Sequence, residues 1–298
     1  MRMKKTLLLM ALICCISAGL RAESGTCGAN LSWEYANGTL TITGSGAMTN
    51  YESYDPAPWY SIRESIVQVS LPEELTTIGK NAFNSCTKLR GVTIPAKVTT
   101  IANNAFDYCQ VMSRVTFAQG STLQTIGECA FLRCYALTSI SLPSSLKTIN
   151  TRIINGSELI KEISIPESVV SIAKEAFYGL PNIETVKLYA KNITLEQNWF
   201  TNTNLNNTNA TRNAVSYYIG KNCESIPDYF AYNMTINSFV CEGKVKKIGT
   251  EAFYYSNFKS NFELPSEIEI IDSYAFYNAK FPENTTLSIP DSLTTIKD

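Results

Sequence analysis

An Ala-Phe pair returns along this chain at an almost constant interval, and it constrains the fold more than any other feature. Its second residue, or a diverged counterpart, is found at Phe83, Phe106, Phe131, Ile154, Phe177, Phe200, Phe230, Phe253 and Phe276. Six of the eight intervals are 23 residues, and the other two are 25 and 30. A fixed period of this length is the sequence mark of a solenoid, in which each unit buries its apolar face by stacking on its neighbours.

Each unit carries the pattern of one short inward-facing strand. In the second unit Val92 and Ile94 are two residues apart, which is the spacing of side chains on one face of a strand. Pro95 follows and ends the strand, because proline has no amide donor for a ladder. Residues 96–104 are expected to bend round, and the Ala105-Phe106 pair to begin a helical or 3-10 turn on the opposite side. Short parallel strands would therefore line one face of the stack.

The repeat resembles a known bacterial family. Residues Ile78 to Pro95 match the consensus Ile-Gly-x-x-Ala-Phe-x-x-Cys-x-x-Leu-x-x-Ile-x-Ile-Pro of the BspA-like leucine-rich repeats, with Val92 for the first Ile after Leu. The resemblance covers roughly residues 65–298, and residues 27–62 resemble the segment that precedes such repeats. It implies a curved leucine-rich-repeat solenoid with strands on its concave face, export, and roles in adhesion or in host and matrix binding. It implies no catalytic residue.

The N-terminal 64 residues differ from the repeats. Residues 1–22 read as a signal peptide, with basic residues, an apolar run and a small-residue cleavage site. Residues 23–64 are expected to form a β-rich cap, because Asn37-Gly38 separates two alternating apolar segments and is typical of a tight hairpin turn. Trp59 and Tyr60 are expected to pack this cap onto the first repeat. The mature chain would then be secreted or held at the cell surface, with no transmembrane segment.

Two parts of the repeat region, residues 65–298, depart from the period. An Asn- and Thr-rich run makes an irregular insertion at about 198–219, interpreted as a surface loop, with partner binding as the less favoured alternative. No C-terminal cap is visible in the sequence. Three explanations stay open: the array continues, the last half-turn is itself the cap, or a partner covers the end. End-to-end self-association is one form of the third.

Composition argues against several functional classes. The chain has 25 basic and 26 acidic residues, unlike the strongly basic footprint of a nucleic-acid binder. It has no histidine, which removes the commonest general base and metal ligand. We therefore expect no enzyme, no cofactor and no metal. Nine cysteines do not change this, since five of the seven beyond the signal peptide fall where the repeat wants a small apolar side chain. A thiol pair in the stack is the less favoured alternative.

The candidate binding site is the concave face. The residues between the inward strand positions read Ser70, Thr93, Thr116, Ser141, Ser164, Lys187, Val240, Glu263 and Ser288. Together with flanking basic residues they suggest binding contacts at Arg90, Thr93, Arg114, Thr116, Ser141, Lys161 and Ser164. The alternative interpretation is equally strong, because serine and threonine suit any solvated strand. A second patch, at Tyr178, Tyr254, Tyr255 and Tyr277, is interpreted first as packing over the turns.

These patterns favour a non-enzymatic repeat protein that binds an extracellular or host protein or glycan. The alternative is a structural spacer that displays another module and has no ligand of its own. A glycosidase with two carboxylates is a distant third, because the acidic residues are scattered over many repeats.

Overall fold

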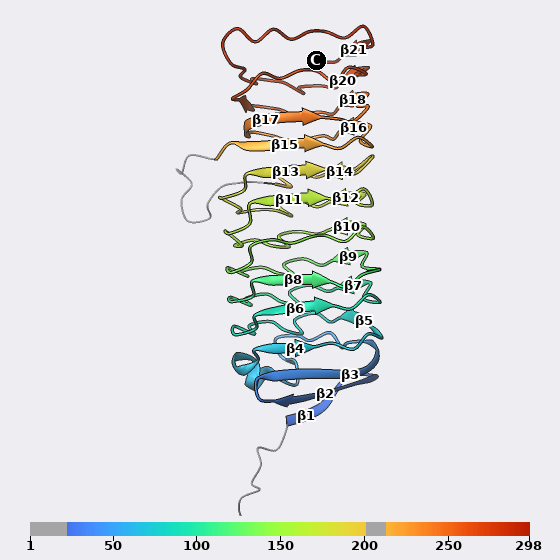
Figure 1. The fold of residues 1–298 in the computed structure, drawn as a ribbon, viewed down its shortest axis with the longest axis vertical. Helices are drawn as coiled ribbons and strands as arrows, with labels where there is room; N and C mark the ends of the chain where they lie inside the picture. Colours follow the sequence, from blue (N-terminus) through green and yellow to red (C-terminus); the bar gives the residue numbers. More distant parts are fainter. Residues whose placement is uncertain (1–22, 201–212) are drawn as a thin grey trace, which may run out of the picture.

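The computed structural model describes residues 23–200 and 213–298, and the expected signal peptide lies outside them. The chain forms a solenoid of about nine turns that stack into one long column (Figure 1). Strands run along two sides of this column, and turns form its remaining edge. The leucine-rich-repeat solenoid expected from the period is confirmed.

The first ladder consists of the strands that the repeat pattern predicts as far as Cys241, but the segments expected around Glu263 and Ser288 form no strand. Its members are β4 (Gln68–Ser70), β6 (Gly91–Ile94), β8 (Arg114–Phe117), β11 (Glu162–Ile165), β13 (Thr185–Leu188), β15 (Val215–Ile219), β17 (Thr235–Cys241) and β19 (Asn257–Phe258). Strand β6 pairs with β8, and β11 to β19 form a continuous parallel sheet. Between β8 and β11 the chain makes only a single bridge, from Val115 to Ile140.

A second ladder runs where the sequence predicted only a bend. Its members are β5 (Leu75–Ile78), β7 (Thr100–Ile101), β9 (Thr125–Ile126), β10 (Thr148–Ile149), β12 (Ser171–Ile172), β14 (Thr194–Leu195), β16 (Ser225–Ile226), β18 (Lys247–Ile248), β20 (Ile270–Ile271) and β21 (Thr295–Ile296). Most of these strands are two residues long, too short to show an alternating pattern in the sequence. They exist because the turns above and below hold the same dipeptide in parallel register.

The edge with the Ala-Phe pairs consists of turns. The helical segments expected there are absent from the described residues, whose one helical element is η1 (Tyr60–Ser65) in the cap. In most turns the backbones two residues before and after the repeat Phe are left-handed, as at Asn81 (φ 55°) and Ser85 (φ 59°). Their amides donate to the next turn, since the Asn81 N–H bonds to the Asn103 carbonyl at 3.1 Å. This geometry excludes a helix and adds a third set of hydrogen bonds between turns.

A column of stacked aromatic rings fills the core behind these turns. Phe106 is fully buried and lies between Phe83 and Phe131, with ring centroids 5.1 and 5.3 Å apart and interplanar angles of 13° and 3°. Offset ring pairs of this kind stabilise a core beyond the area they bury. Trp59 extends the column into the cap, because its ring stacks on Phe83 at 5.7 Å. The repeat Phe therefore joins successive turns from Phe83 to Phe131, and Ile154 interrupts the stack in the following turn.

One turn is out of the register expected from the sequence. Tyr229 and Asn233 have the left-handed backbones that flank the Phe position, so Ala231 occupies that position and Phe230 the preceding one. The Ala231 amide also donates to the Ala252 carbonyl, as the Phe83 amide does to the Ala105 carbonyl. The assignment of Phe230 as the repeat Phe is therefore wrong by one residue. A bulky ring fits here because the neighbouring turn also has one, Trp199, which stacks on Phe230 at 6.3 Å.

The cap contains the expected hairpin and one strand more. Strands β2 (Asn30–Ala36) and β3 (Thr39–Ala47) pair antiparallel around the Asn37-Gly38 turn, and β1 (Glu23–Gly28) pairs with β2. The long β3 pairs with both β4 and β5, so one strand covers the start of both ladders. Trp59 is 1% exposed, which confirms its packing role, whereas Tyr60 is 46% exposed and does not pack between cap and repeats.

The irregular insertion is shorter than expected. Its last residues, Val215–Ile219, form β15 and pair with β13 in full register, so the first ladder has already resumed there. Residues 201–212 of the insertion lie outside the described residues.

Candidate binding face

We call the solvent-facing positions of the first ladder the strand face. Thr93 and Thr116 are directly paired across β6 and β8, and the bridge at Ile140 places Ser141 next in the same row. All three are exposed. The structure thus brings together five of the seven predicted contacts, because Arg114 begins β8 and Arg90 lies directly before β6. The row Ser70, Thr93, Thr116 and Ser141 runs along the solenoid axis.

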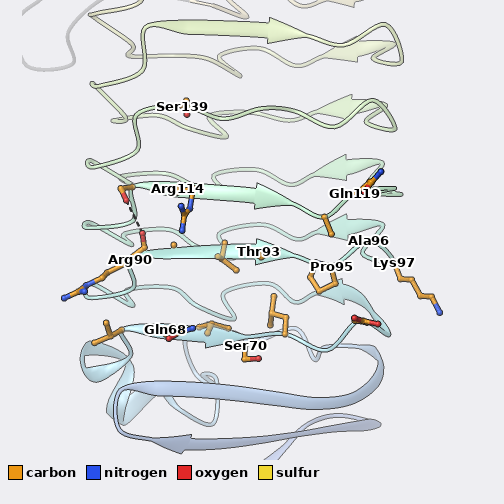
Figure 2. Close-up of a pocket in the computed structure, with 18 of the residues that line it drawn as sticks. Gln68, Ser70, Arg90, Thr93, Pro95, Ala96, Lys97, Arg114, Gln119 and Ser139 are labelled. Carbon is orange, nitrogen blue, oxygen red and sulfur yellow. Dashed lines mark hydrogen bonds between the residues drawn. The ribbon is translucent and has the colours of Figure 1, made fainter.

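This part of the strand face is hollowed. An open hollow of about 1150 Å³ is lined by Ser70, Arg90, Thr93 and Arg114, among others. Figure 2 shows Arg90 and Arg114 at one end of it, Lys97 and Gln119 at the other, and Thr93 between them. Two smaller hollows adjoin it, one sharing Arg90 and the other sharing Arg114. Short side chains flanked by long ones therefore create a groove over four turns.

The two arginines have no acidic partner among the described residues, and each lies beside short or apolar side chains. Gly91 pairs with Arg114 across the ladder, and the Ser113 amide donates to the Arg90 carbonyl at 3.0 Å. A Cβ at Gly91 would lie 2.9 Å from the Arg114 carbonyl oxygen, so a larger residue at this position would force the backbone to shift. Lys88 lines the smaller hollow beside Arg90. The site can therefore offer several charged donors to a ligand.

The remaining two predicted contacts lie elsewhere and are already engaged. The Lys161 ammonium is 2.7 Å from the Glu184 carboxylate, and the Ser164 hydroxyl donates to Glu162 at 3.2 Å. Neither residue lines the hollow at Arg90. Solvation and ion pairing explain these two positions without any ligand.

Sequence reasoning missed three features of this face. Lys88 and Gly91 were not singled out, although both sit beside residues that were. Tyr218 pairs with Lys187 in the row of hydroxyls, and it was overlooked because the insertion shifts the period just before it. Its hydroxyl donates to the Glu242 carboxylate at 2.6 Å. Only Gly91 left a sequence signal, as a glycine inside a strand pattern.

The tyrosines on the turn edge form a second exposed cluster. Tyr254 stacks between Tyr232 and Tyr277, with ring centroids 5.1 and 5.0 Å apart, so its ring faces are covered. Tyr255 and Tyr277 remain 51% and 46% exposed. Tyr178 is not in this cluster, and it lies under Arg152 instead. Packing against neighbouring rings explains the position of Tyr254 fully, but it explains the exposed rings of Tyr255 and Tyr277 only in part.

The cysteines behave as core residues. All seven described cysteines are free thiols, and Cys86, Cys109, Cys134 and Cys223 are buried. The Cys109 thiol donates to the Phe83 carbonyl at 3.2 Å, and the Cys134 thiol to the Phe106 carbonyl at 3.4 Å. Burial raises the pKa of Cys86 and Cys134 to about 12, so both stay protonated at neutral pH. Among the described residues no three potential ligands come together as a metal site.

Known proteins share this architecture. The chain matches the family described as BspA type Leucine rich repeat region, in six copies, over residues 59–154, 117–226 and 224–298. A leucine-rich repeat protein from Eubacterium ventriosum has a similar structure, with a TM-score of 0.53, 19% identity and coverage of 93% of each chain. A leucine-rich repeat protein of T. pallidum is 21% identical over 74% of this chain and 86% of its own, with a TM-score of 0.44.

A leucine-rich cell surface protein from Faecalibacterium prausnitzii is 16% identical, with a TM-score of 0.38, covering 92% of this chain and 94% of its own. No curated protein sequence matches the chain significantly. In the described ranges, no helix is long and apolar enough to cross a bilayer. The family match spans well over half of the chain, and the chain therefore belongs to the BspA-type leucine-rich repeat family.

Proposed function

Because the chain is a BspA-type leucine-rich repeat protein, we propose that it is exported and binds an extracellular macromolecule through its strand face, without catalysis. The family is one of surface proteins, which is compatible with a role in binding or adhesion. The observation that carries the proposal is the groove at Arg90 and Arg114, where two unpaired guanidinium groups lie beside a row of exposed hydroxyls. A solenoid often binds its partners on the surface formed by such a strand row.

The groove would act by surface complementarity. Each guanidinium presents five N–H donors, and each hydroxyl can donate and accept. Thr93 and Thr116 are fixed by the pairing of β6 with β8, so little conformational entropy is lost when a partner binds. The hydroxyl row is therefore preorganised by backbone hydrogen bonds, whereas the exposed side chains of Arg90 and Arg114 lose rotamer freedom on binding.

A structural spacer is the second candidate. The aromatic column and the ion pairs between turns, such as Lys97 with Glu74 at 2.6 Å, stiffen the solenoid along its axis. A spacer needs this stiffness and no ligand. Its strand face would then bind nothing.

Binding of the purified protein to an array of matrix proteins, mucins and glycans tests the proposal, with a heat-unfolded sample as control. We expect saturable binding by the folded protein alone. Replacing Arg90, Thr93, Arg114, Thr116 and Ser141 together should weaken binding and leave thermal unfolding nearly unchanged, because all five side chains are exposed. Full affinity in that variant would contradict the assignment of the face, and no binding by folded protein would favour the spacer.

A further inference from the structure

We propose that the groove at Arg90 and Arg114 binds an anionic glycan, a chain of sugars that carries sulfate or carboxylate groups. The inference rests on the proposed function, since it names the class of partner for the same face.

The charge pattern of the surface is the first argument. Ion pairs between neighbouring turns engage basic residues along the whole solenoid: Lys97–Glu74, Lys161–Glu184, Lys187–Glu162, Lys191–Glu224, Lys244–Glu267 and Lys246–Glu269. The structure describes five arginines. Three of them are paired, Arg63 with Glu64, Arg133 with Asp107 and Arg152 with Glu175. The other two are Arg114, at the start of β8, and Arg90, directly before the adjacent β6.

The surroundings of these two arginines leave their donors to a ligand. Gly91 lies on one side of Arg114, and Ser139, in the next turn, lines both hollows that Arg114 lines. One turn further the row reaches Glu162, but this carboxylate is held by Lys187 at 2.8 Å. Sulfate and carboxylate groups accept two parallel hydrogen bonds from a guanidinium, which makes arginine a good partner for them. The hollow is also lined by Glu73 and Glu74, of which Glu74 is held by Lys97 at 2.6 Å. The two arginines, which have no acidic partner among the described residues, therefore favour an anion.

The lining of the groove favours a glycan over an acidic protein segment. Protein interfaces are anchored by buried aromatic or apolar side chains. Among the described side chains that line the hollow there is no aromatic ring, and none of its larger apolar side chains is fully exposed: Val69, Val92 and Pro95 are buried, and Val67 and Leu71 are half-buried. Exposed Ser70, Thr93 and Ser139 supply hydroxyls instead, which suit the many hydroxyls of a sugar chain.

The direction of the groove fits an extended polymer. The hydroxyl row repeats at the spacing of parallel strands, about 4.8 Å, which is close to the advance of one pyranose ring in an extended polysaccharide. The adjoining hollow continues the row to Thr116 and Ser141 while sharing Arg114. Successive sugars can thus meet successive hydroxyls while their anionic groups reach Arg90 and Arg114.

Titration of the protein with a heparin octasaccharide, its fully desulfated form, dextran and polyglutamate tests this inference. We expect the sulfated octasaccharide to bind, with affinity falling as salt rises. The desulfated form keeps its carboxylates and should bind more weakly, and neutral dextran should bind at least tenfold more weakly than the sulfated probe. The variant R90Q/R114Q should lose about tenfold in affinity for each arginine, since each forms charge-assisted hydrogen bonds. The variant R90K/R114K keeps the charge and should recover part of the loss.

A matched control removes the same charge elsewhere. The side chains of Lys174 and Lys221 are exposed and make no ion pair within the described residues, so K174Q/K221Q should bind the sulfated probe within about twofold of the parent. Equal losses in the two double variants, or none in R90Q/R114Q, would overturn the proposal. So would equal binding of polyglutamate, in favour of an acidic protein partner. If the strand face binds a neutral glycan or a protein, and this binding does not depend on sulfate, the inference of an anionic glycan is refuted. The proposed function, binding of a macromolecule by the strand face, would still stand.

Discussion

Phe106→Ala tests the aromatic column on which the solenoid depends. The ring is fully buried and stacks on a ring in each neighbouring turn, at 5.1 and 5.3 Å. Truncating a buried Phe to Ala costs about 3–5 kcal/mol of unfolding free energy. Two ring pairs are lost at once, and each stabilises the fold by about 0.5–1.5 kcal/mol beyond the effect of the area it buries. We therefore expect a loss in the upper half of the range for a buried Phe. The midpoint of thermal unfolding should fall by about 8–20 °C at 2–4 °C per kcal/mol.

Urea unfolding followed by circular dichroism measures this loss. Tyr54→Ala is the matched control, because Tyr54 is 87% exposed and its removal should change the free energy of unfolding very little. Phe106→Ile should cost less than Phe106→Ala, since Ile154 fills the equivalent position in its own turn. A loss below about 1.5 kcal/mol for Phe106→Ala, far under the usual cost for a buried Phe, would refute the argument that stacked rings join the turns.

Three further predictions concern the core, the cap and the surface. Cys86 and Cys134 have a pKa of about 12 in the folded chain, and an unfolded thiol has one of about 8.5. The contribution of the two buried thiols to stability should therefore be complete below about pH 8.5 and be lost as pH rises toward 12. The urea midpoint of the C86A/C134A variant should fall less steeply between pH 8 and 10 than that of the parent protein. An equal fall in both proteins would contradict this prediction. Trp59→Phe keeps a ring but removes the indole N–H, which donates to a buried carbonyl at 2.8 Å, so unfolding should cost about 1–3 kcal/mol less, and an unchanged midpoint would show that the bond adds nothing to the cap. Lys161→Ala breaks an exposed ion pair and should change the free energy of unfolding by less than about 1 kcal/mol; a larger loss in the same assay would mean that pairs between turns stabilise the column more than we expect.

The spacing of apolar residues by itself determined the solenoid, its turn length and the inward positions of the first ladder. It could do so because each turn repeats the same local pattern, so a diverged residue in one turn can be assigned from the equivalent residues of the other turns. Val92 and Ile94 are both buried, as their spacing predicted. The hairpin at Asn37-Gly38 was also readable, because two successive residues with positive φ favour this dipeptide.

Features that depend on neighbouring turns were decided only by the tertiary structure. The second ladder is made mostly of dipeptides such as Thr100–Ile101, which are strands only because adjacent turns hold them in register. The exchange of Phe230 and Ala231 follows from hydrogen bonds to the turn above and cannot be seen in the period. The same holds for the candidate site. Serine, threonine and arginine predicted the candidate face, but whether a basic residue is free or paired depends on which acid lies one turn away. Among the described residues Arg90 and Arg114 have no acidic partner, whereas Lys161 has Glu184.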